Sequence, residues 1–372
     1  MTSSLRLKKS VFSSWINFTA LLLFATAAAN AQLAAFHDNQ DKFHIFDRGK
    51  LTEAEYLPVN SFSVGGNCLL YVDNRNHLKM YHNGQVSELE VSNPTKYIAK
   101  DYLAVYSIGG IVRIIDNGRV FTVSTNSVTW AAEDSLVTFY DVSQQLLAVY
   151  YKGEIHMLED GLAGSPANQF RTGSNLVAYV SSRTKDFKIF YGGENREIEP
   201  FISGGSFKTG RDVVAWVNQG DQKMRVFLKG EIYDVEDFPP ASYQVGDGIV
   251  AYIDNTGSFK VFTEGDVVTI SSFKPDFYRV VNGMVIYGEQ GYFKVWYNDQ
   301  FYTLESFTPG DFKAEWSTIV YRDVNRNVKV FSAGESKVLT YDIAEETNLY
   351  RDVIVVNKGM NNNNVYYRGK KY

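Results

Sequence analysis

One short pattern recurs ten times between about residue 33 and the C-terminus: an aromatic residue followed three positions later by glycine. Most steps are about 34 or 35 residues, with wider steps around Gly193. The copies are Phe46/Gly49, Tyr81/Gly84, Ile115/Gly118, Tyr150/Gly153, Phe190/Gly193, Phe227/Gly230, Phe262/Gly265, Trp296/Asp299, Phe331/Gly334 and Tyr366/Gly369, of which Ile115 and Asp299 depart from the pattern. A second series keeps the same spacing: Phe36, Tyr71, Tyr106, Tyr140, Tyr179, Trp216, Tyr252, Tyr287, Tyr321 and Val356. A period in this range indicates one supersecondary unit stacked on copies of itself.

The clearest repeat, residues 242–273, predicts four short strands. β-branched and aromatic residues dominate its stretches Tyr243–Val245, Ile249–Ile253, Phe259–Thr263 and Val267–Ser271, and Gly, Asp and Asn lie between them. Glu264-Gly265 is suited to a tight hairpin, because glycine accepts positive φ without a Cβ clash. The repeats show no sustained 3.6-residue period. Four-stranded antiparallel units of this length predict an all-β fold, a β-propeller.

The number of blades follows less directly from the repeats. The first copy lacks the opening short strand, and the last stops after Lys370-Lys371-Tyr372. We therefore expect one ring of roughly nine blades whose end hairpins are shared or swapped. The alternative is two five-bladed rings divided near the Gly161–Asn168 insertion. An open solenoid is disfavoured, because the sequence shows no polar capping repeat.

The first 31 residues read as a signal peptide. Arg6, Lys8 and Lys9 form a basic start, residues 18–29 are apolar, and Ala29-Asn30-Ala31 fits a cleavage site. The apolar stretch is short for a membrane span. We expect Sec export, cleavage after Ala31, and a propeller domain over residues 32–372 in the periplasm, without direct insertion into the membrane.

Cysteine and charge restrict the classes of partner. The single cysteine, Cys68, lies in an apolar strand and is expected to be a small buried side chain. The formal net charge is −5, and basic residues are spread evenly. Nucleic acid is therefore not an expected partner.

The residue types that usually carry chemistry do not form a recognisable motif. The five histidines, His37, His44, His77, His82 and His156, lack metal-ligand spacing. Aspartates follow the second strand of several repeats, at Asp38, Asp73, Asp141, Asp254 and Asp323. Their loops are too short for calcium loops, and we expect the carboxylates to bond their own turns. The sequence predicts no catalytic residues, no metal and no cofactor, and it leaves the binding residues unknown.

A basic residue usually stands two positions before the repeated aromatic. The members are His44, Lys79, Arg113, Lys188, Arg225, Lys260, Lys294 and Lys329, while Ala148 and Asn364 break the series. Two readings remain open. In one, the heads pair with acids on neighbouring blades or with solvent; in the other, they form a cationic ring that binds an anionic partner.

A third aromatic series falls at the first strand of the repeats: Tyr97, Trp130, Phe170, Phe207, Tyr243, Tyr278, Phe312 and Tyr350. We expect these rings to line the seams between blades near one face. Some of them could instead be exposed as a docking surface.

The layout resembles exported propellers of Bacteroidota. It carries the repeated strings Val250-Ala-Tyr252 and Lys260-Val-Phe262 after a Sec signal. Within that group it resembles the periplasmic plug subunit of the type IX secretion translocon, which seals the periplasmic mouth of an outer-membrane barrel. The chain reaches Tyr372 within a blade and shows no C-terminal sorting domain of type IX cargo, which favours retention in the periplasm.

The resemblance implies a protein-interaction module whose partner is an outer-membrane translocon or another envelope protein. The alternative is a periplasmic propeller that binds a glycan or a peptide. An enzyme is not expected, because the irregular positions offer no nucleophile–base pair.

Overall fold

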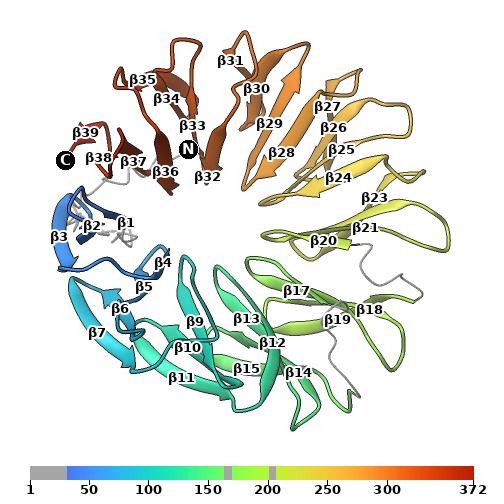
Figure 1. Ribbon diagram of the computed structural model, residues 1–372. Helices are drawn as coiled ribbons and strands as arrows, with labels where there is room; N and C mark the ends of the chain where they lie inside the picture. The colour runs from blue at the N-terminus through green and yellow to red at the C-terminus, as the bar shows by residue number, and fades with distance from the viewer. Residues whose placement is uncertain (1–31, 163–169, 201–206) are drawn as a thin grey trace, which may run out of the picture. The chain divides into compact units, whose positions relative to one another are not determined.

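The computed structural model describes residues 32–162, 170–200 and 207–372. Within them, 39 strands form ten antiparallel sheets that follow one another in chain order around a ring (Figure 1). Within those ranges, no helix is long and apolar enough to cross a membrane. The expected signal peptide, residues 1–31, and most of the Gly161–Asn168 insertion lie outside the described residues.

Each sheet is a blade, and the strands of a four-stranded blade are numbered first to fourth from the axis outward. Blade 1 lacks the first strand, so its three strands are the second to fourth. Blades 1 to 4 consist of β1 (Leu33–His37), β2 (Phe43–Asp47) and β3 (Lys50–Glu55); β4 (Ser61–Val64), β5 (Cys68–Val72), β6 (Leu78–His82) and β7 (Gln85–Glu90); β8 (Lys96–Ala99), β9 (Leu103–Ile108), β10 (Ile111–Asp116) and β11 (Arg119–Ser124); and β12 (Ser127–Glu133), β13 (Leu136–Asp141), β14 (Leu146–Tyr151) and β15 (Glu154–Glu159). Blades 5 to 7 consist of β16 (Phe170–Thr172), β17 (Leu176–Val180), β18 (Phe187–Tyr191) and β19 (Glu194–Glu199); β20 (Phe207–Thr209), β21 (Val213–Val217), β22 (Met224–Leu228) and β23 (Glu231–Glu236); and β24 (Ser242–Val245), β25 (Ile249–Ile253), β26 (Phe259–Thr263) and β27 (Asp266–Ser271). Blades 8 to 10 consist of β28 (Phe277–Val281), β29 (Met284–Glu289), β30 (Tyr292–Tyr297) and β31 (Gln300–Glu305); β32 (Phe312–Glu315), β33 (Thr318–Arg322), β34 (Val328–Ser332) and β35 (Glu335–Thr340); and β36 (Glu346–Tyr350), β37 (Val353–Asn357), β38 (Asn363–Tyr367) and β39 (Lys370–Lys371).

The predicted propeller is confirmed, but the expected number of about nine blades is wrong, and so is the two-ring alternative. The end hairpins are not shared: β1–β3 form a separate three-stranded sheet, and the two-residue β39 completes the last sheet. Residues 31–372 form one compact unit. Blade 1 closes the ring by packing β1 against β37, where Ala34 and Phe46 meet Val355 and Tyr367.

The core lies between neighbouring blades. The second strands carry uninterrupted buried runs, such as the five residues of β25, because both faces of each blade are covered. Val261 of blade 7, for example, packs in one cluster with Tyr287 and Trp296 of blade 8. Members of both repeated aromatic series are core residues, such as the fully buried Tyr252 and Phe262, whereas Phe36 is only partly buried.

Two faces of the ring follow from the antiparallel order of the strands. The turn face carries the inner turns, between first and second strands, and the outer hairpin turns, between third and fourth strands. The loop face carries the middle turns, between second and third strands, and the linkers from each fourth strand to the next blade. The outer hairpins have positive φ at both central residues, such as 49° at Glu264 and 94° at Gly265, which is the geometry of type I′ turns.

Candidate functional site

The basic residues of the repeat are paired with acids and do not form a free cationic ring. In blade 2, Lys79 Nζ lies 2.6 Å from Glu55 Oε1 at the end of β3, and Tyr71 Oη donates to the same oxygen at 2.8 Å. Lys79 Nζ is also 3.0 Å from Asp73. We call this arrangement the seam clamp, because one glutamate holds an aromatic and a basic side chain of the next blade.

The seam clamp recurs at other seams. Its further members are Tyr106 and Arg113 on Glu90, Trp216 and Arg225 on Glu199, Tyr252 and Lys260 on Glu236, and Lys329 on Glu305. The hydrogen bond to Glu305 raises the pKa of Lys329. The other three basic residues pair within their own blade: His44 with Asp38, Lys188 with Glu197 and Lys294 with Glu289. Five of the eight basic residues thus join neighbouring blades at the seams, and the other three form ion pairs inside one blade.

The remaining predicted candidates also have structural partners. Asp254 Oδ1 accepts hydrogen bonds from the backbone N–H groups of Thr256 and Ser258, and the same pattern recurs at Asp38, Asp73 and Asp323. His37 Nε2 lies 3.2 Å from the backbone nitrogen of Val59. Within the described ranges, no three His, Cys, Asp or Glu side chains are placed to hold a metal ion. Cys68 is buried, and burial raises the pKa of its thiol to about 12.

The third aromatic series packs in the seams, as in Phe207 against Phe187. None of its eight members is exposed. Tyr350 is out of phase, because it pairs with Val353, whereas Tyr243 pairs with Tyr252 and Thr347 with Val356. Tyr350 is instead the last residue of β36, next to the inner turn of blade 10, where it lines a pocket.

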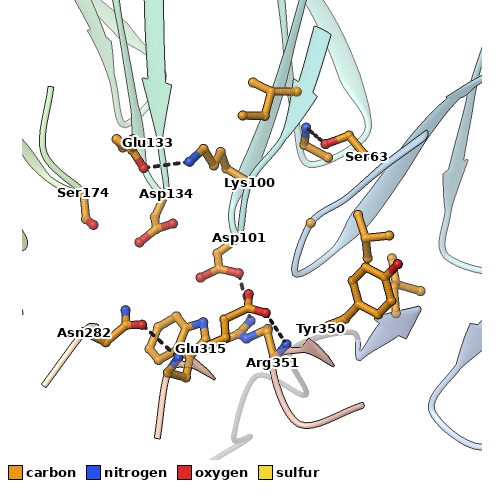
Figure 2. Close-up of a pocket in the computed structure, with 16 residues that line it drawn as sticks. Ser63, Lys100, Asp101, Glu133, Asp134, Ser174, Asn282, Glu315, Tyr350 and Arg351 are labelled. Carbon is orange, nitrogen blue, oxygen red and sulfur yellow. Dashed lines mark hydrogen bonds and ion pairs between the residues drawn. The ribbon is translucent and has the colours of Figure 1, made fainter. Parts of the chain in front are cut away.

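This axial pocket has a volume of about 340 Å³ and lies among the inner turns of the turn face. Its lining comes from eight blades and includes the charged residues Lys100, Asp101, Glu133, Asp134, Glu315 and Arg351. Figure 2 shows Asp101 and Asp134 on one side of the pocket, with Asn282, Glu315 and Arg351 opposite. The four acids and two bases leave a formal charge of −2 on the lining.

Ion pairs at the axis join blades that are not neighbours. Arg211 of blade 6 lies 2.6 Å from Asp134 of blade 4, and Arg351 of blade 10 lies 3.4 Å from Asp101 of blade 3. Both guanidinium groups lie over the ring of Trp316, at 5.5 Å and 4.3 Å from its centroid. The two arginines therefore hold the inner turns together across the axis.

Several polar groups of the axial pocket are only partly satisfied. Arg351 Nη1 is buried without a hydrogen-bond partner, although Asp101 is near. Glu315 accepts one backbone N–H, that of Arg351, at 2.8 Å. Burial raises the pKa of Asp101 to about 6, with Arg351 opposing and Asp134 reinforcing the shift. Burial likewise raises the pKa of Glu315.

Sequence reasoning missed how the inner turns approach one another. A Cβ on Gly210 would clash with the carbonyl oxygen of Gly246, and a Cβ on Gly246 with that of Asn282. A weak signal exists, since glycine stands three residues before the second strand at Gly65, Gly173, Gly210 and Gly246. These glycines let neighbouring turns meet backbone to backbone around the axial pocket.

The loop face presents exposed apolar side chains. Its linkers and middle turns carry Tyr56, Leu57, Val91, Val142, Phe238, Phe273, Val324, Tyr341, Ile343 and Met360. In the linkers Tyr56, Phe273 and Tyr341 are 71%, 71% and 78% exposed. Proline follows within three residues at Pro58, Pro94, Pro239 and Pro275, and its fixed φ stiffens the loops.

A comparison with curated protein sequences gives no match. Solved structures with a similar fold include the computationally designed protein Ika8, at 16% identity and a TM-score of 0.38, with 81% of this chain and 99% of that chain covered. Prp20p from Saccharomyces cerevisiae has 9% identity and a TM-score of 0.32, with 63% and 81% covered. PorZ of Porphyromonas gingivalis, a surface component of the type-IX secretion system, has 9% identity and a TM-score of 0.29, with 84% and 51% covered. None of these likenesses bears on function.

Family membership rests on a match over nearly the whole chain. Residues 27–372 match the family described as the 10-bladed beta propeller domain. The match agrees with the ten sheets within the described residues. This chain belongs to the 10-bladed β-propeller domain family.

Proposed function

We propose that this chain is a non-enzymatic interaction module of the periplasm that binds an envelope protein through its loop face. The proposed partner is an outer-membrane protein translocon, whose periplasmic opening the ring seals. The observation that carries the proposal is the gathering of exposed aromatic and aliphatic side chains in the linkers and middle turns of one face. Exposed apolar surface of this kind marks protein-binding sites.

The linkers suit docking for two physical reasons. Aromatic rings such as Tyr56, Phe273 and Tyr341 bury a large area at low cost in conformational entropy. A broad ring can also meet a barrel mouth at several blades together, and a stable interface needs on the order of 1,200 Å² or more.

The test is co-purification of the tagged chain from outer-membrane extracts. The triple variant Phe238→Ser, Phe273→Ser, Tyr341→Ser should lose the partner. The control triple variant Leu51→Ser, Val86→Ser, Val267→Ser changes half-exposed side chains on the outermost strands and should keep it. Deletion of the chain should make the envelope leakier to large solutes. The proposal fails if the chain migrates alone, or if both triple variants retain the partner equally.

A further inference from the structure

Polar side chains that line the axial pocket have hydrogen-bonding groups that no other residue satisfies. Asp101 and Arg351 are about nine-tenths buried, with side chains 10% and 14% exposed. In the described part of the chain, Asp101 accepts no hydrogen bond. Its 3.4 Å ion pair with Arg351 Nη1 is not a hydrogen bond, so this buried nitrogen has no hydrogen-bond acceptor. A buried polar group without a partner costs free energy comparable to a lost hydrogen bond, and in native proteins it calls for a specific explanation.

The charges of the pocket favour a cationic group that donates several hydrogen bonds. Asp101, Asp134 and Glu315 face one cavity, where Asp134 reinforces the raised pKa values of the other two carboxyls. Asp134 is held by Arg211 at 2.6 Å and Asp101 contacts Arg351 at 3.4 Å, whereas Glu315 forms no ion pair within the described residues. A bare metal ion does not suit them, because no three acidic groups among the described residues converge closely enough to ligate one. An ammonium group has several N–H donors that point in different directions. It can therefore hydrogen-bond to carboxylates that are too far apart to ligate one metal ion.

The guanidinium nitrogen that lacks a hydrogen-bond acceptor adds a second requirement. Arg351 Nη1 is a donor, so the same ligand should present an oxygen acceptor close to its ammonium group. A volume of about 340 Å³ is at the small end of ligand sites and suits one or two residues. We infer that the axial pocket binds an ammonium group adjacent to a carbonyl or carboxylate oxygen, the pair of groups that a free amino acid or a peptide N-terminus presents.

This inference goes beyond docking at the loop face and does not depend on it, because the pocket lies on the turn face. Ammonium binding requires the ionised form of Asp101, whose pKa is raised to about 6 by burial. The charged groups that act on Asp101 are Arg351, Arg211 and Lys100, which favour the carboxylate, and Asp134, which disfavours it. Affinity should therefore fall as the pH drops from 7 to 5, by about tenfold for one titrating carboxyl.

The experiment is calorimetric titration of the purified chain at pH 7 with L-alanine, trialanine and N-acetyl-trialanine. Heat of binding with trialanine alone identifies a peptide N-terminus as the source, and binding of both unblocked probes identifies the shared ammonium–oxygen pair. The acetylated peptide should not bind, because acetylation removes the cation and leaves the rest of the chain unchanged. The inference is overturned if neither unblocked probe binds, or if N-acetyl-trialanine binds as tightly as trialanine.

Variants connect the binding to the pocket. Asp101→Asn and Glu315→Gln should each weaken the affinity about tenfold or more, the effect of losing one hydrogen bond to a charged group. Asp266→Asn, an exposed acid beside an outer hairpin of the same face, is the matched control and should leave the affinity unchanged. Thermal melts identify any variant that fails to fold, and the pH series on the unaltered chain then tests the role of Asp101. Unchanged affinity in folded Asp101→Asn contradicts the inference.

Discussion

The seams between blades and the inner turns at the axis both bring carboxylates against basic side chains, but they do so in different ways. In the seam clamps the acid precedes the base by 24 residues at Glu55–Lys79, Glu236–Lys260 and Glu305–Lys329. At the axis, Asp134–Arg211 and Asp101–Arg351 join distant blades. All four residues stand two positions before the second strand of their blade, so the repeat gives their place in the inner turns but not which blades pair. The seams thus repeat one contact between neighbouring blades, whereas the axis joins blades across the ring and also lines the axial pocket.

The largest expected effect tests how tightly the axis is packed. Gly246→Ala places a Cβ against the backbone carbonyl of Asn282, so we expect a loss of about 3 kcal/mol or more in the free energy of unfolding. Gly283→Ala changes a glycine of the next inner turn, where a Cβ meets nothing within 4 Å, and should cost no more than about 0.5 kcal/mol. Denaturant unfolding measures both, and equal losses would show that the inner turns are not in backbone contact.

The next effect concerns the outer hairpins, which are regular like the seams. Gly265→Val forces a β-branched residue to a φ of 94° and brings its Cβ to 3.3 Å from Tyr233, so we expect a loss of about 1 to 3 kcal/mol. Gly265→Asp should cost less, because Asp299 already occupies the same position in blade 8 at a φ of 56°. A thermal melt of Gly265→Val unchanged from that of the parent chain would contradict the hairpin assignment.

A smaller loss should follow from breaking one seam clamp. Glu236→Ala leaves Lys260 Nζ and Tyr252 Oη without their shared acceptor, and we expect it to cost about 1 to 2 kcal/mol in the free energy of unfolding. The matched control is Glu197→Ala in blade 5, where the acid is 66% exposed and lies 3.9 Å from Lys188. Its effect should be near zero. If both variants lose the same stability, the seam clamp is an ordinary surface pair.

A further comparison of the two regions uses the pH dependence of stability. The pKa of Asp101 is raised by burial to about 6, so the folded state binds the proton more tightly than the unfolded chain. Ionised Asp101 thus lowers stability above pH 6, and this cost disappears as the pH falls toward 4. Asp101→Asn should lose that part of the pH dependence. Melting curves of both chains from pH 4 to 8 measure it, and parallel curves would show that Asp101 does not titrate in this range.

The regular parts of the molecule could be predicted from the sequence because they repeat. Phe262 and Gly265 indicated a hairpin, and the structure places positive φ at both of its central residues. Lys260 was expected to reach an acid of a neighbouring blade, which is one of the two readings considered, and it contacts Glu236. Periodicity is enough here, because neighbouring blades meet in the same way at many seams.

The axis and the blade count could not be predicted in the same way. The contact between Asp101 and Arg351 depends on the curvature of the whole ring, which places the inner turns of blades 3 and 10 face to face. Tyr350 fitted the third aromatic spacing approximately, but the pairing register puts it at the pocket. The number of blades depended on whether the end hairpins exchange strands, and that is decided by packing between the two ends of the chain.

The seam between blades 1 and 10 closes the ring without a covalent link between the two blades. Every other seam is crossed by a linker of the chain, whereas blades 1 and 10 are held by side chains, such as Asn363 donating to the carbonyl oxygen of His37 at 2.7 Å. We therefore expect the ring to open first at this seam, because no peptide linker holds it, and to keep its other seams intact. Blade 10 of one open copy can then pack against blade 1 of another. Refolding at high protein concentration should therefore produce head-to-tail oligomers.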